Sequence, residues 1–169
     1  YKRQVNTVLN DNGKLIGYNT DGYGFMQSVR DAGHDITGKN ITVMGVGGAS
    51  MAICAQSALD GAASVHIFAR RTSRYWNRTQ KFAENLSAKT GCQVCLFDND
   101  DHTALRDSIA QSYLLINATS VGMVPDIDDT IIKDTSLFHP ELVVADVVYE
   151  PQETRLLREA KAAGCQTFN

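Results

Sequence analysis

The chain has 169 residues, of which 43% are hydrophobic and 21% are charged, and it carries a net charge of −3. This size and composition suit one complete domain, or one domain with part of another. The acidic balance and the lack of a basic stripe argue against nucleic-acid binding. No apolar run reaches the roughly 18 residues that a membrane span needs. We therefore expect no nucleic-acid partner, no membrane segment and a cytoplasmic location.

The first segment predicts a hairpin and a helix. Two β-like runs, residues 5–9 and 14–18, flank an Asn-Asp-Asn-Gly turn of the kind that joins antiparallel strands. A helical pattern follows from Asp21 to about Ala32 and ends near Gly33. An aspartate that opens a helix is commonly a cap or first-turn residue, so Asp21 has a structural explanation from its position alone.

From residue 41 onward, strand-like and helix-like segments alternate. The expected strands are 41–44, 64–68, 92–97, 113–117, 142–148 and 165–168, and the expected helices are 48–60, 75–89, 101–111 and 152–163. A loop rich in Gly, Pro and Asp covers about 118–136. This alternation predicts the α/β class, with a doubly wound parallel sheet in the order 3-2-1-4-5-6. A ligand would then bind at the C-terminal ends of the strands.

A glycine-rich turn follows the first of these strands. The apolar run ITVM stops at Gly45, and Gly47 and Gly48 come before a helix-like segment that begins at Ala49. Gly45 permits a sharp turn, and Gly47 lets the backbone approach a phosphate without a Cβ in the way. Exposed N–H groups and the helix dipole favour an anion there. The turn therefore predicts a site for a dinucleotide diphosphate, which includes Val46.

The end of the second strand bears on the choice of dinucleotide. NAD-binding proteins usually place an acidic residue there, whereas this chain reads Ala69-Arg70-Arg71-Thr72-Ser73-Arg74. Arginine offers a forked donor to a 2′-phosphate, which favours NADP over NAD. One or more of these arginines, Arg71 in particular, is equally compatible with a solvated surface position.

Cysteines give little sign of chemistry. Cys92 and Cys95 form a C-x-x-C, but the segment is strand-like and nothing nearby completes a metal site. We expect reduced cysteines in core positions and no metal.

Five segments in order resemble the shikimate dehydrogenase family, including its quinate/shikimate branch. They are VNT (5–7), GYNTDGYG (17–24), GVGGAS (45–50), INATSVGM (116–123) and DVVYEP (146–151) followed by TRLL. The resemblance implies a substrate domain followed by a Rossmann-type domain. Residues 1–19 would be the last hairpin of the first, and residues 20–169 would be the second, incomplete at its C-terminus.

The resemblance also implies NADP-dependent, reversible reduction of 3-dehydroshikimate to shikimate, on the route to chorismate and the aromatic amino acids. The partner would be a small molecule, namely shikimate, 3-dehydroshikimate or quinate, and the oligomeric state stays open. Asp21 would be the catalytic residue, paired with a lysine, and the substrate would meet Asn6, Asp21 and Tyr149. The residues that would contact the cofactor are Gly45, Val46, Gly47, Gly48, Ala49, Ala69, Arg70, Arg71, Arg74, Asn117, Thr119, Ser120, Met123 and Val147.

The chain also departs from the family pattern. Ala69 stands where the family has Asn, Arg71 where it has Thr, and Thr72 where the quinate branch often has Asp. The catalytic lysine would lie upstream of Tyr1, and a glutamine that contacts substrate would lie beyond Asn169. We therefore expect a piece of a longer protein. An NAD-preferring quinate/shikimate dehydrogenase and a non-catalytic NADP-sensing module remain as alternatives.

Overall fold

A six-stranded parallel sheet forms the body of the molecule. The computed structural model describes residues 5–169. The strands are β3 (Asn40–Met44), β4 (Ser64–Ala69), β5 (Gln93–Asp98), β6 (Leu114–Asn117), β7 (Val143–Asp146) and β8 (Gln166–Phe168). Their order is β5-β4-β3-β6-β7-β8, and neighbouring strands run parallel. This order confirms the predicted doubly wound sheet of Rossmann type.

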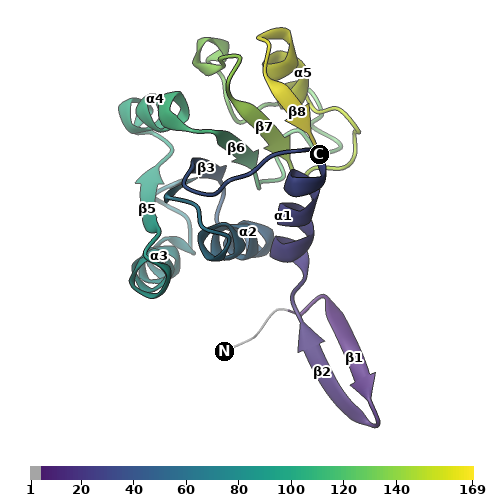
Figure 1. Cartoon of the computed structure of the whole chain (residues 1–169). Helices are drawn as coiled ribbons and strands as arrows, with labels where there is room; N and C mark the ends of the chain where they lie inside the picture. The colour runs from purple at the N-terminus through teal and green to yellow at the C-terminus, as the bar shows by residue number, and fades with distance from the viewer. Residues whose placement is uncertain (1–4) are drawn as a thin grey trace.

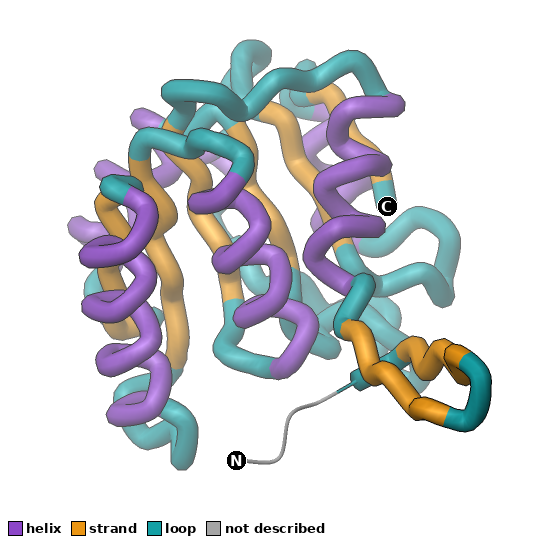
Figure 2. Tube along the Cα trace, turned by 60° about the horizontal axis from the view of Figure 1, so that its bottom comes forward, coloured by secondary structure: helices purple, strands orange, loops and turns teal. Residues whose placement is uncertain are grey.

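Helices cover both faces of the sheet (Figure 1). They are α1 (Asp21–Asp31), α2 (Gly48–Leu59), α3 (Trp76–Thr90), α4 (His102–Gln111) and α5 (Arg155–Ala162), with a 3-10 turn η1 (Thr135–Leu137). One apolar cluster joins the sheet to α1, α2 and α3, which stand side by side in front of the strands in Figure 2. A second cluster joins the other face to α4 and α5. This double cover explains why every residue of β6 and β7 is buried. Within residues 5–169, no helix is long and apolar enough to cross a membrane.

Near the C-terminus, two predicted boundaries were wrong because single side chains set where one strand ends and one helix begins. The strand expected at 142–148 stops at Asp146, whose carboxylate accepts the backbone N–H of Val148 at 2.9 Å and so turns the chain. The helix expected from 152 begins at Arg155, because Thr154 is its N-cap and accepts from the N–H of Leu157. Both residues belong to a buried network described below.

The predicted hairpin is present and projects away from the sheet (Figure 1), although its first strand lies two residues later than the predicted 5–9. Strands β1 (Thr7–Asp11) and β2 (Lys14–Tyr18) pair antiparallel. The turn takes positive φ at both central residues, 49° at Asn12 and 90° at Gly13, which matches the twist of a two-residue hairpin turn. Every residue of β1 is exposed, including Val8 and Leu9. Residues 1–4 of the predicted first segment lie outside the described residues.

Helix α1 is held against α2 by a glycine. A Cβ built on Gly22 would lie 2.3 Å from the carbonyl oxygen of Ala52, so the two helices meet backbone to backbone. Because α1 leads into the N-terminal end of β3, its own first residues lie at the opposite, C-terminal edge of the sheet. Gly22 therefore fixes where Asp21 stands relative to α2.

We expect Gly22→Ala to lower the free energy of unfolding by about 1–3 kcal/mol, because the methyl group overpacks a backbone contact. The matched control is Gly24→Ala in the same helix, where a Cβ meets nothing within 4 Å. That control should raise stability by roughly 0.5–1 kcal/mol through helix propensity. Urea unfolding of both variants measures the difference, and equal stability of the two would contradict the close approach.

Candidate functional site

The glycine turn between β3 and α2 is built into the fold at Gly45. This residue has a φ of +110°, and its N–H donates to the carbonyl of Phe68 at 2.8 Å. A Cβ there would lie 2.8 Å from the carbonyl oxygen of Ala118. Ser50, fully buried in the first turn of α2, donates its hydroxyl to the Gly45 carbonyl at 2.6 Å. Hydrogen bonds within the protein therefore fix the conformation of the turn at Gly45.

Gly47 has a different environment. Its φ of −78° and ψ of −176° are extended values that any residue adopts, and a Cβ there would meet nothing within 4 Å. Gly47 is the N-cap of α2, and no side chain caps the helix. The first N–H groups of α2 therefore face open space with the positive end of the helix dipole behind them. This arrangement suits a phosphate group.

A cleft of about 860 Å³ lies beside this turn. We call it the arginine cleft. Its lining includes eight of the residues predicted to contact cofactor, namely Gly45, Val46, Gly47, Ala69, Arg70, Arg74, Thr119 and Ser120. The other six, Gly48, Ala49, Arg71, Asn117, Met123 and Val147, are not among its lining residues.

The three arginines after β4 differ in their contacts. The Arg71 guanidinium stacks over the Trp76 ring at 4.7 Å, outside the cleft. Arg74 stacks over the Tyr75 ring at 4.7 Å and donates to its hydroxyl at 2.6 Å. Arg70 is exposed and lines the cleft. Within residues 5–169, none of the three is paired with a carboxylate, so the cleft has unneutralised positive charge.

The end of β5 adds two polar residues that sequence reasoning missed. Asp98 accepts from the backbone N–H groups of Arg71 and Asp100, at 3.4 and 3.2 Å, and so supports the loop after β4. Asn99 lines the arginine cleft, and its Oδ1 is buried with no donor among the described residues. Only the register of β4 with β5, which sets Asp98 beside Ala69, brings these side chains to the site.

Asn6 and Asp21, fifteen residues apart, are brought into direct contact. The Asn6 side-chain amide donates to Asp21 Oδ1. The Asn6 Oδ1 accepts from both the backbone N–H and the hydroxyl of Thr20, each at 3.0 Å. Thr20 occupies the cap position of α1 and Asp21 is its first residue, and both Asn6 and Asp21 are exposed. The pair thus joins the hairpin to α1 and leaves the carboxylate facing outward.

Asn117 lies at the centre of a buried network. Its amide donates to the Val121 carbonyl and to Asp146 at 3.1 and 3.0 Å, and its oxygen accepts twice from Thr119. Asp146 also accepts from the Thr154 hydroxyl at 2.7 Å. Both donors and the oxygen of Asn117 are therefore used within the protein, so it acts by shaping the loop that carries Thr119 and Ser120. Burial raises the pKa of the Asp146 carboxyl, although the hydrogen bonds oppose this.

We expect the Asp146 carboxyl to make stability depend on pH. Because its folded pKa is raised above 3.8, the folded state binds the proton more tightly than the unfolded state. The free energy of unfolding should fall as the pH rises from about 4 through the raised pKa. Asp146→Asn lacks this contribution, so the parent should lose stability relative to the variant over that range. Urea unfolding of both proteins across the pH series checks the sign. A parent that gains stability relative to Asp146→Asn as the pH rises would contradict the prediction.

Tyr149 and Met123 lie outside the arginine cleft. Tyr149 is 81% exposed in the turn after β7, and Met123 is 44% exposed in the loop after β6. Val147 is half-buried and its N–H donates to the Asn117 carbonyl. All three follow the C-terminal ends of β6 or β7, the same edge of the sheet as the glycine turn.

The cysteines are free thiols. Cys54, Cys92 and Cys165 are buried and Cys95 is half-buried. Burial raises the pKa of the Cys54 thiol to about 12, which keeps it protonated and unreactive. Among residues 5–169, no group of three His, Cys, Asp or Glu side chains could hold a metal ion.

No family model matches the chain, but the similar proteins described next are all named as shikimate or quinate/shikimate dehydrogenases. A shikimate dehydrogenase (NADP(+)) of Listeria innocua is 49% identical over 165 residues, covering 98% of this chain and 56% of the relative. A quinate/shikimate dehydrogenase of Escherichia coli is 40% identical, covering 98% and 57%. The crystal structure of shikimate 5-dehydrogenase from Listeria monocytogenes, in complex with shikimate and NAD, superposes with a TM-score of 0.93 at 48% identity, covering 98% and 57%.

The strand order and the glycine turn define a Rossmann-type domain of the class that binds nicotinamide dinucleotides. The relatives share this architecture over nearly all of the chain. Over nearly its whole length the chain is similar to proteins of the shikimate dehydrogenase family. It spans about half the length of the curated relatives that it matches.

Proposed function

We propose that this chain is the dinucleotide-binding part of an NADP-dependent shikimate dehydrogenase, which interconverts 3-dehydroshikimate and shikimate in the cytoplasm. The observation that carries the proposal is the uncapped α2 N-terminus at Gly47 beside a cleft lined by Arg70 and Arg74. The Listeria innocua relative, named for the same substrate and cofactor, supports it.

The residues present fit the cofactor. The N-terminus of α2 would hold the diphosphate, and Arg70 and Arg74 would hold the 2′-phosphate, since arginine forks match phosphate geometry. Thr119 and Ser120, on the loop that Asn117 shapes, line the same cleft. When bound, the nicotinamide ring supplies or accepts the hydride.

The substrate side of the proposal rests on Asn6 and Asp21. Asn6 would donate to a substrate hydroxyl, and Asp21 would orient the catalytic lysine of the family and favour its charged form. Tyr149, exposed at the same edge of the sheet, would border the substrate. The exposed hairpin β1–β2 fits a role as the last piece of a substrate domain, which would cover its apolar side chains.

The test measures binding and turnover on the whole protein. Titration calorimetry with NADP and NAD gives both dissociation constants, and cofactor reduction at 340 nm (the nicotinamide absorbance) gives rates with shikimate and with quinate. We expect tighter NADP binding and faster oxidation of shikimate. A protein that binds NADP without turning over either substrate would favour a sensing module instead.

An NAD-preferring quinate/shikimate dehydrogenase is the second candidate. Two observations favour it: the Escherichia coli relative is named for both substrates, and the Listeria monocytogenes structure holds NAD with shikimate. Arg71 stacks on Trp76 and is not among the residues that line the cleft, so the proposal gives it no contact with the 2′-phosphate in either case. Preference for NAD in the calorimetric titration would decide for this candidate.

A further inference from the structure

Tyr75 makes two separate contacts with the side chain of Arg74. Its ring lies 4.7 Å beneath the guanidinium, and its hydroxyl accepts from Arg74 Nη2 at 2.6 Å. Both contacts come from a residue that the family motifs do not include. The stacking leaves the charge of Arg74 intact, and one accepted N–H leaves four of the five guanidinium donors for a ligand.

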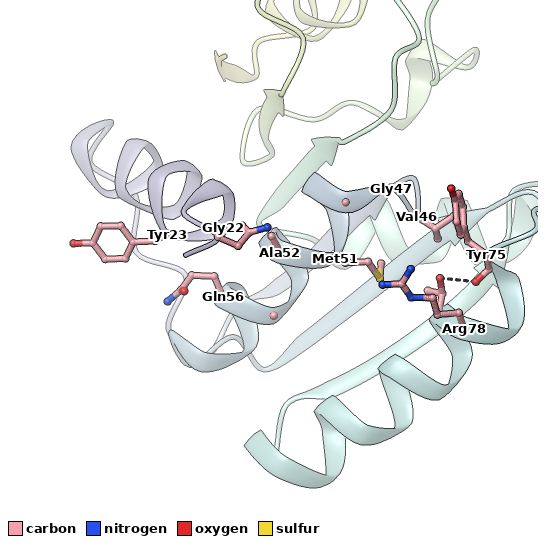
Figure 3. A pocket seen from close by; sticks show the side chains of 13 residues that line it. Gly22, Tyr23, Val46, Gly47, Met51, Ala52, Gln56, Tyr75 and Arg78 are labelled. Carbon is pink, nitrogen blue, oxygen red and sulfur yellow. Dashed lines mark hydrogen bonds between the residues drawn. The ribbon is translucent and has the colours of Figure 1, made fainter. Parts of the chain in front are cut away.

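The backbone around Tyr75 is itself fixed. Its N–H donates to the Ser73 hydroxyl at 3.3 Å, and its carbonyl accepts from the Thr79 hydroxyl at 2.9 Å, the bond dashed in Figure 3. Thr79 is buried in the first turn of α3. Tyr75 is therefore held by α3, and its contacts with Arg74 hold the exposed arginine side chain in turn.

Tyr75 also stands beside the glycine turn. It lines the arginine cleft, and it lines a second cavity of about 660 Å³ between α1, α2 and α3, in which Figure 3 shows it close to Val46. Val46 and Gly47 likewise line both spaces. Tyr75 thus forms part of the wall between them, and on the cleft side it presents Arg74.

We propose that Tyr75 is a positioning residue that preorganises Arg74 for the 2′-phosphate and so sets the preference for NADP over NAD. The inference deepens the proposed function and rests on it. An exposed arginine loses side-chain entropy when a ligand immobilises it. Tyr75 imposes most of that restriction before the ligand arrives, which strengthens binding of the phosphate. NAD has no 2′-phosphate and gains nothing from it.

The experiment compares Tyr75→Phe, which keeps the ring and removes the hydroxyl, with Tyr75→Leu, which removes both contacts. Calorimetry on the whole protein gives dissociation constants for NADP and NAD, and for 2′-AMP and 5′-AMP as minimal probes. We expect Tyr75→Phe to weaken NADP and 2′-AMP binding about twofold to tenfold, as loss of one hydrogen bond implies. Tyr75→Leu should weaken both further, and NAD and 5′-AMP should change less than about twofold.

Two controls separate positioning from a structural role. Tyr23→Phe alters another tyrosine with an arginine over its ring, since the Arg30 guanidinium lies 5.9 Å from the Tyr23 ring centroid. Tyr23 does not line the arginine cleft, so this variant should change the binding of neither cofactor. In an Arg74→Ala background, Tyr75→Phe should no longer affect NADP binding, because the pair acts as a unit. Equal weakening of NADP and NAD, unchanged NADP binding, or a parent that binds only NAD would overturn the inference. A parent that binds neither cofactor would instead overturn the proposed function, and this inference with it.

Discussion

Replacing Gly47 with alanine is expected to leave the domain folded and to weaken NADP binding about 10-fold to 100-fold. The backbone at Gly47 has ordinary extended angles, and the added methyl group meets no protein atom within 4 Å. The space it would enter is the one where a diphosphate must approach the first N–H groups of α2. An overpacked contact of about 1–3 kcal/mol corresponds to a loss of this size. Calorimetric titration and urea unfolding of the same preparation measure both properties.

The matched control is Gly45→Ala, two residues earlier in the same turn. There the φ of +110° and the close carbonyl of Ala118 oppose any side chain. We expect the free energy of unfolding of this variant to fall by about 1–3 kcal/mol or more. The two glycines thus separate what the fold requires from what the ligand requires. An unchanged NADP dissociation constant in Gly47→Ala would contradict the proposal that the diphosphate binds at the α2 N-terminus.

The strand order could be predicted from the sequence because the hydrophobic periodicity and the positions of the turn residues indicate the same elements along the chain. Buried apolar runs such as 114–116 alternate with amphipathic segments, and the glycine turn marks which strand is first. Parallel strands joined by right-handed crossovers leave few topologies. Element ends were less predictable, because they depend on single side chains such as Asp146 and Thr154, whose partners lie on other elements.

The candidate site was predictable only where it consists of consecutive residues. The glycine turn and the arginines after β4 are local, so their spacing is visible in the sequence. Asn99 reaches the cleft through strand register, and Tyr75 acts by stacking, a contact that no spacing encodes. Asn117 was assigned to the cofactor from its motif, whereas its polar atoms are used within the protein. Its cofactor role is therefore proposed as indirect.

Asp21→Asn in the whole protein is expected to lower kcat for shikimate oxidation by about 100-fold or more while leaving the NADP dissociation constant nearly unchanged. The size follows from the usual contribution of a positioned acid or base, which the lysine can provide only in the correct charge state and orientation. Asparagine keeps the oxygen that accepts from Asn6, so the hairpin and α1 stay joined. The variant therefore removes the charge with little change in shape.

Two further variants make the result specific to that charge. Asp31→Asn removes a carboxylate from the other end of α1, where Gln27 is its partner, and should leave kcat unchanged. Asp21→Ala also removes the contact with Asn6, so it should raise KM for shikimate beyond any effect of Asp21→Asn. An Asp21→Asn enzyme that turns over at the parental rate would reduce Asp21 to the first residue of a helix.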